Sequence, residues 1–227
     1  MKIGIIAAMS NERKQIVSLL SDAREIKRGA FTFTEGEISG NEVILMESGI
    51  GKVNAAIGAS ELIRSYSPDC IINTGVAGGV DESLNVMDVV VGQSVCYHDV
   101  WCGDGNEYGQ VQGLPLYFGG DAHLFDVAMH LESEVTLRGG LICSGDQFIS
   151  DHDQLATIKK RFPEALAVDM ESASVAQTCH IFGVPFLSFR IISDTPGGDN
   201  RYGQYLNFWD TVAEKSFQVT EAFLRSL

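Results

Sequence analysis

The chain has 227 residues, of which 45% are hydrophobic, and its formal net charge at pH 7 is −14. A chain of this length and hydrophobic content can bury one large core, so we expect a single domain over residues 1–227. The negative charge disfavours a nucleic acid as partner, because such binding relies on Lys and Arg to neutralise phosphates, and a small-molecule ligand fits better.

The chain lacks an apolar run of the roughly 18–20 residues that a membrane span needs. Its first residues, Met1–Gly4, enter an apolar run with no basic segment before it. We therefore expect a cytoplasmic protein with no membrane partner. The five cysteines are widely spaced and none belongs to a C-x-x-C pair, so the sequence indicates neither disulfides nor zinc.

Strand-like and helix-like apolar periods alternate along the chain, which predicts an α/β fold. The expected strands are Ile3–Ala8, Phe31–Ile38, Glu42–Glu47, Cys70–Asn73, Asp88–Tyr97, Leu137–Ile142, Ala165–Val168 and Phe186–Ile192. The expected helices are Asn11–Leu20, Lys52–Tyr66, Asp121–Leu131, Asp151–Phe162, Glu171–Phe182 and Phe208–Ser226. We expect an antiparallel hairpin from the second and third strands, and hence a three-layer αβα sandwich with a mixed central sheet. Val89–Tyr97 is long enough to bend into a second sheet or a barrel-like extension.

Two glycine-rich segments follow expected strands, and neither has the spacing of a phosphate-binding loop. Thr74–Gly79 lacks G-x-G-x-x-G, and Ser48–Lys52 lacks both the earlier glycine of a P-loop and the hydroxyl residue after its lysine. We interpret Ser48–Lys52 as a tight turn and Thr74–Gly79 as a loop whose backbone approaches a ligand closely.

Three acids, Glu12, Glu171 and Asp194, each follow an apolar run that is typical of a buried strand. Ligands of open α/β sheets bind just beyond strand ends, so three acids there indicate a site. Three acids without a metal cluster favour acid/base chemistry on a neutral or cationic substrate.

Each candidate also has a structural interpretation. Glu12 and Glu171 suit the first turn of a helix, where the helix dipole favours an acid, and Asp194 suits the start of a turn. Met170 and Phe148 are residue types most often found in a core. The segments His98–Asp99 and Asp151–Asp153 offer metal-ligand types but no third ligand by spacing, and Asp151 is better explained as a helix N-cap.

Seven ordered blocks together resemble the 5′-methylthioadenosine/S-adenosylhomocysteine nucleosidases of the nucleoside phosphorylase superfamily. The blocks are Gly4–Met9 with Glu12, Glu47–Val53, Asn73–Gly79, Tyr97–Asp99, Ser144–Ile149, Ala167–Ala173 and Arg190–Asp194. The resemblance spans nearly the whole chain and is weak in Val100–Leu114 and after Pro196. It implies a nucleoside phosphorylase-like fold, a homodimer, a role in methionine salvage, and a reaction without metal or cofactor.

The resemblance also implies a role for each acid in breaking an adenine N-glycosidic bond. Asp194 matches the general acid that protonates N7 of adenine, Glu12 matches the residue that activates the attacking water, and Glu171 matches the ribose clamp. Burial beside other acids would raise the pKa of Asp194 in the direction that this role needs. An acid and a base with room for a water between them follow the logic of an inverting glycosidase.

Further residues receive supporting roles from the same resemblance. Met170 would pack under the ribose, Phe148 would stack on adenine and the Ile149 backbone would read the purine edge. Arg190 would hold the Glu12 end of the site and Ser193 would support Asp194. Val76 stands beside the water and the ribose, where these nucleosidases often carry a serine.

The sequence departs from the family in two segments. Trp101, Cys102 and Asp104 lie in a stretch that is one residue shorter than in the family and lacks its phenylalanine. In family members this stretch comes from the neighbouring subunit and lines the pocket for the 5′-alkylthio group, where Trp101 would supply apolar surface. A lid over the adenine pocket is expected within Gly197–Phe208, closed by Tyr205, Phe208 or Trp209.

Several activities remain open at this point. Phosphorolysis is disfavoured because Asn73 replaces an arginine of the related phosphorylases and because Glu12 places a carboxylate where phosphate would sit. The expected function is irreversible hydrolysis of 5′-thioadenosines to adenine and a 5-thioribose. The alternatives are a futalosine or 5′-deoxyadenosine hydrolase, a purine nucleoside phosphorylase, and a nucleoside-binding sensor without catalysis.

Overall fold

The computed structural model describes residues 1–196, 200–211 and 213–227. Its strands are β1 (Lys2–Ala7), β2 (Ser21–Arg28), β3 (Phe31–Ile38), β4 (Asn41–Glu47), β5 (Cys70–Gly79), β6 (Val89–Tyr97), β7 (Phe118–Gly119), β8 (Leu137–Ser144), β9 (Ala165–Asp169) and β10 (Phe186–Asp194). Its helices are α1 (Ser10–Val17), α2 (Lys52–Tyr66), α3 (Ala122–Met129), α4 (His152–Arg161), α5 (Ser172–Phe182), α6 (Arg201–Thr211) and α7 (Ala213–Ser226).

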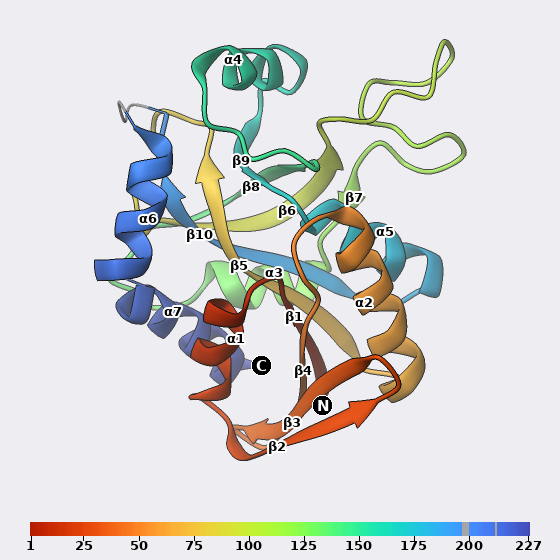
Figure 1. The fold of residues 1–227 in the computed structure, drawn as a ribbon, viewed down its shortest axis with the longest axis vertical. Coiled ribbons are helices and arrows are strands. Elements are labelled where there is room, and N and C mark those ends of the chain that lie inside the picture. Colours follow the sequence, from red (N-terminus) through yellow and green to blue (C-terminus); the bar gives the residue numbers. More distant parts are fainter. Residues whose placement is uncertain (197–199, 212) are drawn as a thin grey trace.

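One mixed sheet joins these strands in the order β10-β6-β8-β9-β5-β1-β4-β3-β2, with β7 beside β6. β10 also pairs with β5, so the strands from β10 to β5 close into a ring, while β1, β4, β3 and β2 extend from it as an open sheet (Figure 1). This confirms the mixed α/β sheet, the hairpin of β3 and β4, and the barrel-like extension that includes β6.

Alternate residues of the central strands face two different helical layers. On β4, Ile44 and Met46 belong to the core that α2 and α5 cover, whereas Val43 and Leu45 belong to the core that α1, α3 and α7 cover. This period of two is what a strand buried on both faces produces. The expected αβα layering is therefore confirmed, with α4 over a third cluster beside the ring.

Local signals explain several element ends. The Asp151 side chain accepts a hydrogen bond from the Gln154 amide at 2.8 Å and begins α4, as the N-cap interpretation predicts. Gly183, with φ of +69°, ends α5 in the left-handed conformation that glycine adopts most readily. All nine residues of β10 are buried, which is typical of a strand paired on both sides.

The structure corrects three of the expected elements. Ser21–Arg28, expected as no element, forms strand β2 at the edge of the sheet. Thr74–Gly79, expected as a loop, continues β5 and pairs with β10 and β9. The single helix expected over Phe208–Ser226 is two helices, and α6 begins seven residues earlier, at Arg201.

The expected lid segment, Gly197–Phe208, includes residues 197–199, which lie outside the described residues. Its described part belongs mostly to α6, which contacts β10 and α7. None of the helices in the described ranges combines the length and hydropathy needed to cross a bilayer.

Candidate active site

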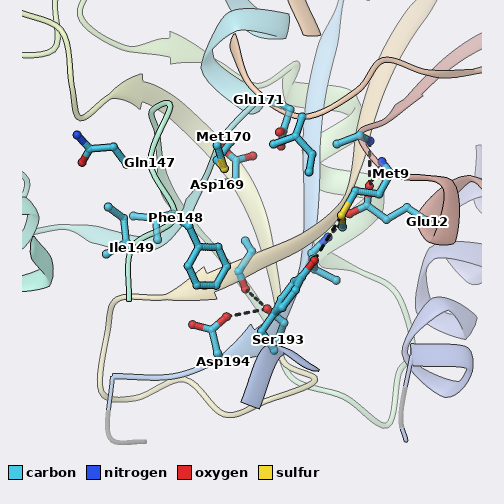
Figure 2. Close-up of a pocket in the computed structure, with 17 residues that line it drawn as sticks. Met9, Glu12, Gln147, Phe148, Ile149, Asp169, Met170, Glu171, Ser193 and Asp194 are labelled. Carbon is cyan, nitrogen blue, oxygen red and sulfur yellow. Dashed lines mark hydrogen bonds between the residues drawn. The ribbon is translucent and has the colours of Figure 1, made fainter. Parts of the chain in front are cut away.

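A cavity lies where the ends of β1, β5, β9 and β10 meet the starts of α1 and α5, a loop after β8, and α6 (Figure 2). Besides the lid candidate Tyr205, eight of the site residues expected from the sequence line it: Glu12, Val76, Phe148, Ile149, Met170, Glu171, Ser193 and Asp194. The other lining residues are Ala8, Met9, Ile50, Ala77, Gly78, Gln147, Val168, Asp169 and Tyr205. Figure 2 shows Glu12, Glu171 and Asp194 on three different sides of this space.

Glu12 lies in the first turn of α1, and its carboxylate is held by backbone amides. Oε2 accepts hydrogen bonds from the amides of Ala8 and Met9 at 2.9 and 3.0 Å, and Oε1 accepts one from Val76 at 3.0 Å. Burial raises the pKa of Glu12, while the Arg190 charge and these three amides oppose the rise. Its carboxylate is therefore fixed in place and, because it is buried, has a higher proton affinity than an exposed glutamate.

Gly75 of β5 makes the approach of Glu12 possible. A Cβ at this position would overlap Glu12 Oε1, and the Gly75 φ of +151° is one that other residues rarely adopt. The expected loop is therefore a strand, and the group that its backbone approaches at Gly75 is the Glu12 side chain, whereas the expected approach to a ligand stays a prediction.

Arg190 is completely buried beneath the cavity and connects its acids. Its guanidinium lies 2.7 Å from Asp169 Oδ2 and 3.6 Å from Glu171 Oε2, and it also donates hydrogen bonds to the side chains of Asn73 and Ser172. Buried charges are tolerated when they are paired and hydrogen-bonded in this way. The ion pairs of Arg190 are with Asp169 and Glu171, whereas it acts on Glu12 through its charge alone.

Glu171 is the residue just before α5, and its Oε1 accepts a hydrogen bond from the Gly51 amide at 3.0 Å. Burial raises its pKa to about 7, with the Arg190 charge opposing the rise and the Asp169 charge supporting it. Glu171 therefore changes its charge near neutral pH.

Asp194 ends β10 and is 98% buried. Its Oδ1 accepts a hydrogen bond from Ser193 Oγ at 2.8 Å, and its Oδ2 accepts one from Arg201 Nε at 2.7 Å. Burial raises the pKa of Asp194, and the Arg201 charge and the two hydrogen bonds oppose the rise. The expected contact of Ser193 with Asp194 is present, and the Arg201 contact is an addition that the sequence interpretation missed.

Aromatic rings form the wall beside Asp194. Phe148, which is 43% exposed, meets the Tyr205 ring edge to face at 5.5 Å, and the Tyr205 hydroxyl lies 3.4 Å from Met9 Sδ. Of the three lid candidates, Tyr205 lines the cavity, whereas Phe208 and Trp209 pack in the core under α6.

A polar cluster outside the cavity ties this wall to α2. Lys52 Nζ contacts both carboxylate oxygens of Asp99 at 2.7 and 2.8 Å. The backbone amide of Lys52 donates a hydrogen bond to Asp146 Oδ1. The Asp146 amide in turn donates to Asp99 Oδ2 at 2.9 Å. The loop that carries Phe148 is thus joined to the turn whose amide binds Glu171.

The three expected 5′-pocket residues lie away from this cavity. Trp101 is 55% exposed and stacks on Tyr108, and Cys102 and Asp104 are exposed beside it. In Figure 1 the segment after β6 extends outward from the body of the molecule. Within a single chain, therefore, the structure does not bring Trp101, Cys102 or Asp104 to the acids.

The site residues missed in the sequence are Asp169 and Arg201. Asp169 lies two residues before Glu171 in the Asp-Met-Glu block, so proximity in a recognised motif could have indicated it. Arg201 has no such signal, because it lies outside every block that the sequence analysis identified. The described residues contain no group of three or more His, Cys, Asp or Glu placed to hold a metal ion.

Comparisons with known proteins bear on this geometry. A family profile described as the phosphorylase superfamily matches residues 2–225. A 5′-methylthioadenosine/S-adenosylhomocysteine nucleosidase of Chromohalobacter salexigens is 40% identical over 230 residues, covering 100% of this chain and 97% of the relative.

Solved structures agree with the sequence comparison. The 5′-methylthioadenosine/S-adenosylhomocysteine nucleosidase from S. pneumoniae, bound to a transition-state inhibitor, superimposes with a TM-score of 0.93 at 38% identity, covering 100% of this chain and 99% of the other. The corresponding enzyme of Colwellia psychrerythraea, bound to adenine, superimposes with a TM-score of 0.92 at 35% identity, covering 100% and 96%.

Proposed function

The chain belongs to the 5′-methylthioadenosine/S-adenosylhomocysteine nucleosidases of the phosphorylase superfamily, and from this premise we propose how its cavity works. The enzyme hydrolyses the N-glycosidic bond of 5′-methylthioadenosine and S-adenosylhomocysteine and releases adenine. The observation that carries the mechanism is that two buried acids with raised pKa, Glu12 and Asp194, line one cavity from different sides.

Asp194 is the general acid of this mechanism. It gives a proton to N7 of adenine, so that the base leaves as a neutral molecule when the bond from C1′ to N9 breaks and its electron pair passes to the base. A carboxyl group can do this near neutral pH only if its pKa is raised, and the burial of Asp194 supplies that shift.

Glu12 is the general base for the attacking water. Three backbone amides fix its orientation, while burial increases its affinity for the proton that the water gives up. With the acid and the base on different sides of the sugar, water attacks the face opposite to the departing base.

Glu171 and Met170 bind the ribose between these two acids. Glu171 Oε2 lies 3.6 Å from Arg190, and the carboxylate lines the cavity, where it is suited to accept hydrogen bonds from two sugar hydroxyls. Its negative charge also stabilises the cationic sugar of the transition state. Arg190 keeps Glu171 and Asp169 in place from below the cavity.

The adenine base lies against the aromatic wall. Phe148 and Tyr205 line the cavity beside Asp194, and Ile149 presents its backbone from the same loop as Phe148. Aromatic rings at this distance suit a flat heterocycle. Tyr205 takes the role expected of the lid residue.

Hydrolysis is supported over phosphorolysis by the contacts of two residues. Glu12 places a negative charge beside the sugar, where a phosphate would need cations. Asn73, at the position of an arginine in related phosphorylases, is completely buried and engaged with Ile6 O, Ser172 and Arg190. Neither residue offers a positive charge to the cavity.

The enzyme is a homodimer in this proposal. Ile50 just before α2 and Val53 and Ile57 within it are exposed apolar residues, each at least 50% exposed, and Ile50 also lines the cavity. A partner subunit on this surface would bring its own Trp101 segment to the 5′ end of the nucleoside.

Two substitutions test this arrangement. Ile57→Glu should give a monomer in sedimentation velocity, and Trp101→Ala should raise KM for 5′-methylthioadenosine more than for adenosine. A dimer that survives Ile57→Glu contradicts this arrangement.

We also propose a cytoplasmic enzyme of methionine salvage. Its reaction leaves the 5-thioribose that carries the methylthio group, and the acidic chain of 227 residues has no feature that favours a nucleic-acid partner.

The first experiment measures adenine release from 5′-methylthioadenosine, S-adenosylhomocysteine, 5′-deoxyadenosine and adenosine, each with and without phosphate. Fast release from the thio-nucleosides that is indifferent to phosphate supports the mechanism. A requirement for phosphate would overturn the role of Glu12.

The second experiment tests the acid. Asp194→Asn should lower kcat by about 10²–10⁴-fold while it still binds the nucleoside, because general acid catalysis typically contributes that much. The matched control is Asp126→Asn, on the exposed face of α3, which should keep the normal rate. A variant at Asp194 with nearly full activity would show that another group protonates the base.

A further inference from the structure

The feature behind this inference is the pairing of Asp194 with Arg201, the first residue of α6. Arg201 is 97% buried, its Nε donates to Asp194 Oδ2 at 2.7 Å, and its Nη2 lies 2.6 Å from the same oxygen. Ser193 donates to the other oxygen. Two donated hydrogen bonds and one ion-pair contact thus reach the carboxylate, which is the arrangement of an ionised acid. An ionised Asp194 cannot give a proton to a base.

The Arg201 guanidinium is poorly satisfied where it lies. Its Nη1 and Nη2 are buried and make no hydrogen bond within the part of the chain that the structure describes, and the contact of Nη2 with Asp194 is an ion pair without hydrogen-bond geometry. Buried N–H groups without acceptors cost free energy, which weakens the binding of Arg201 at this position. The contact that holds it there is with one carboxylate oxygen, Asp194 Oδ2. Arg190, in contrast, has acceptors from α5, β5 and β9 around it.

The space that Arg201 occupies borders the cavity. A Cβ on Gly78, which lines the cavity, would overlap Arg201 Nη2 and would lie 3.1 Å from Asp194 Oδ2. Tyr205, one helical turn after Arg201, lines the same cavity. Arg201 therefore reaches Asp194 from the helix that also bounds the base side of the site.

This inference rests on the proposed role of Asp194. We infer that Arg201 is a positioning residue that competes with the nucleoside base for the Asp194 carboxylate, so that Asp194 takes up its proton only when the base displaces Arg201. The proton comes from solvent, passes from Asp194 to N7 of adenine, and leaves with the base when the glycosidic electrons move to N9.

The surroundings of Asp194 are consistent with a proton uptake that Arg201 controls. The groups that face Asp194 within the described residues are Arg201 and Tyr205 from α6, Ser193 from its own strand, the backbone at Gly78 of β5, and Glu12 and Glu171 from the other sides of the cavity. Arg201 is the cation among them. Burial raises the pKa of Asp194 and Arg201 is the largest opposing influence, so its departure raises that pKa further.

The test compares pH profiles for hydrolysis of 5′-methylthioadenosine. The profile of kcat/KM reports groups of the free enzyme and that of kcat reports groups of the complex. In Arg201→Gln the alkaline limb of kcat/KM should move to higher pH by about one unit, so that kcat/KM on that limb rises about tenfold. The reason is that a neighbouring cation lowers the pKa of a carboxyl group by at least about one unit, and the variant removes that cation. The alkaline limb of kcat should not move with it.

Two variants serve as controls. Arg201→Lys keeps a cation and should retain the wild-type limb, and Arg225→Gln removes an exposed arginine paired with Glu221 and should also retain it. The inference is overturned if Arg201→Gln leaves the kcat/KM limb in place, or if the kcat limb moves equally, since Arg201 would then stay beside the acid in the complex.

A calorimetric measurement does not depend on the folding of an Arg201 variant. Glu12→Gln, which should bind substrate without turnover, is titrated with 5′-methylthioadenosine in two buffers of different ionisation enthalpy, on the alkaline side of the kcat/KM limb. About one proton should be taken up per site, and no uptake would contradict the displacement of Arg201. Asp194→Asn separates the two proposals. If that variant remains active, the proposed acid is wrong, whereas if it is inactive and the Arg201→Gln limb is unmoved, only this inference fails.

Discussion

Two buried arginine–carboxylate pairs lie at opposite ends of the site, and they are built differently. Arg190 at the ribose end is paired with Asp169 and Glu171 and hydrogen-bonded to Asn73 and Ser172. Arg201 at the base end contacts one oxygen of Asp194 and leaves two nitrogens without hydrogen bonds in the described residues. The difference separates a pair that fixes geometry from a pair that can be exchanged for a ligand. Substitutions at Arg190, Glu171, Arg201 and Tyr205 test that separation.

Removal of Arg190 should have the largest effect. Arg190→Met leaves two buried acids without their cation, and breaking a buried pair in this way typically costs about 3–5 kcal/mol of the free energy of unfolding. Urea denaturation measures this loss. Arg225→Met, at an exposed pair, is the control and should change stability by no more than about 0.5 kcal/mol. A cost at Arg190 near that of the control would remove the distinction between the two ends.

Glu171 should show a stability that depends on pH. Its folded pKa of about 7 lies above the ordinary glutamate pKa of 4.5, so its contribution to stability is full below about pH 4.5 and is lost as pH rises through 7. Glu171→Gln should therefore have a larger free energy of unfolding than the wild type at pH 8, by about 1–2 kcal/mol, and a correspondingly higher Tm. The difference should shrink towards pH 5, while turnover falls at both pH values. Equal melting shifts at pH 5 and pH 8 would contradict the raised pKa.

Arg201→Met should cost much less stability than Arg190→Met. Asp194 can take up a proton when its cation is removed, because burial already raises its pKa, and the two unsatisfied nitrogens disappear with the side chain. We expect a loss of at most about 1 kcal/mol at pH 7, measured by urea denaturation beside Arg190→Met. Equal losses in the free energy of unfolding would show that Arg201 contributes as much to stability as Arg190.

Tyr205 should give the smallest effect. Tyr205→Phe removes a hydroxyl 3.4 Å from Met9 Sδ and keeps the ring against Phe148, so stability should change by less than about 0.5 kcal/mol and KM by less than about threefold. Tyr205→Ala removes the ring as well and should raise KM by about tenfold or more. If the two variants behave alike, the ring is not part of the base pocket.

Much of the fold is predictable from the sequence because its strands and helices carry strong apolar patterns. β2 is the exception among the longer strands: its residues are mostly exposed and charged, so no alternation marks it, and it forms by pairing with β3. Thr74–Gly79 reads as a loop by composition, yet its pairing with β10 and β9 makes it a strand. In both segments the partner strand decides the structure, and a single sequence does not contain that information.

The site residues also divide into those that a sequence pattern predicts and those that depend on tertiary placement. Glu12, Glu171 and Asp194 can be found because each follows a predicted strand, and ordered strand ends converge in this kind of sheet. Arg201 could not be found, because its contact with Asp194 depends on where α6 is placed, and no sequence pattern indicates that placement. The roles of all these residues stay predictions until the variants are measured.

β5 has a consequence for how this site can vary. Gly75 lies under Glu12 and Gly78 lies under Asp194 and Arg201, three residues farther along the same strand. At about 3.3 Å per residue, these two points are roughly 10 Å apart. The strand therefore fixes the distance between the proposed general base, Glu12, and the proposed general acid, Asp194. Substitutions in the surrounding helices and loops can reshape the pocket for different substituents without altering this spacing. An inserted or deleted residue between the two glycines would change it at once, so diversification of such enzymes is expected everywhere except in this four-residue interval.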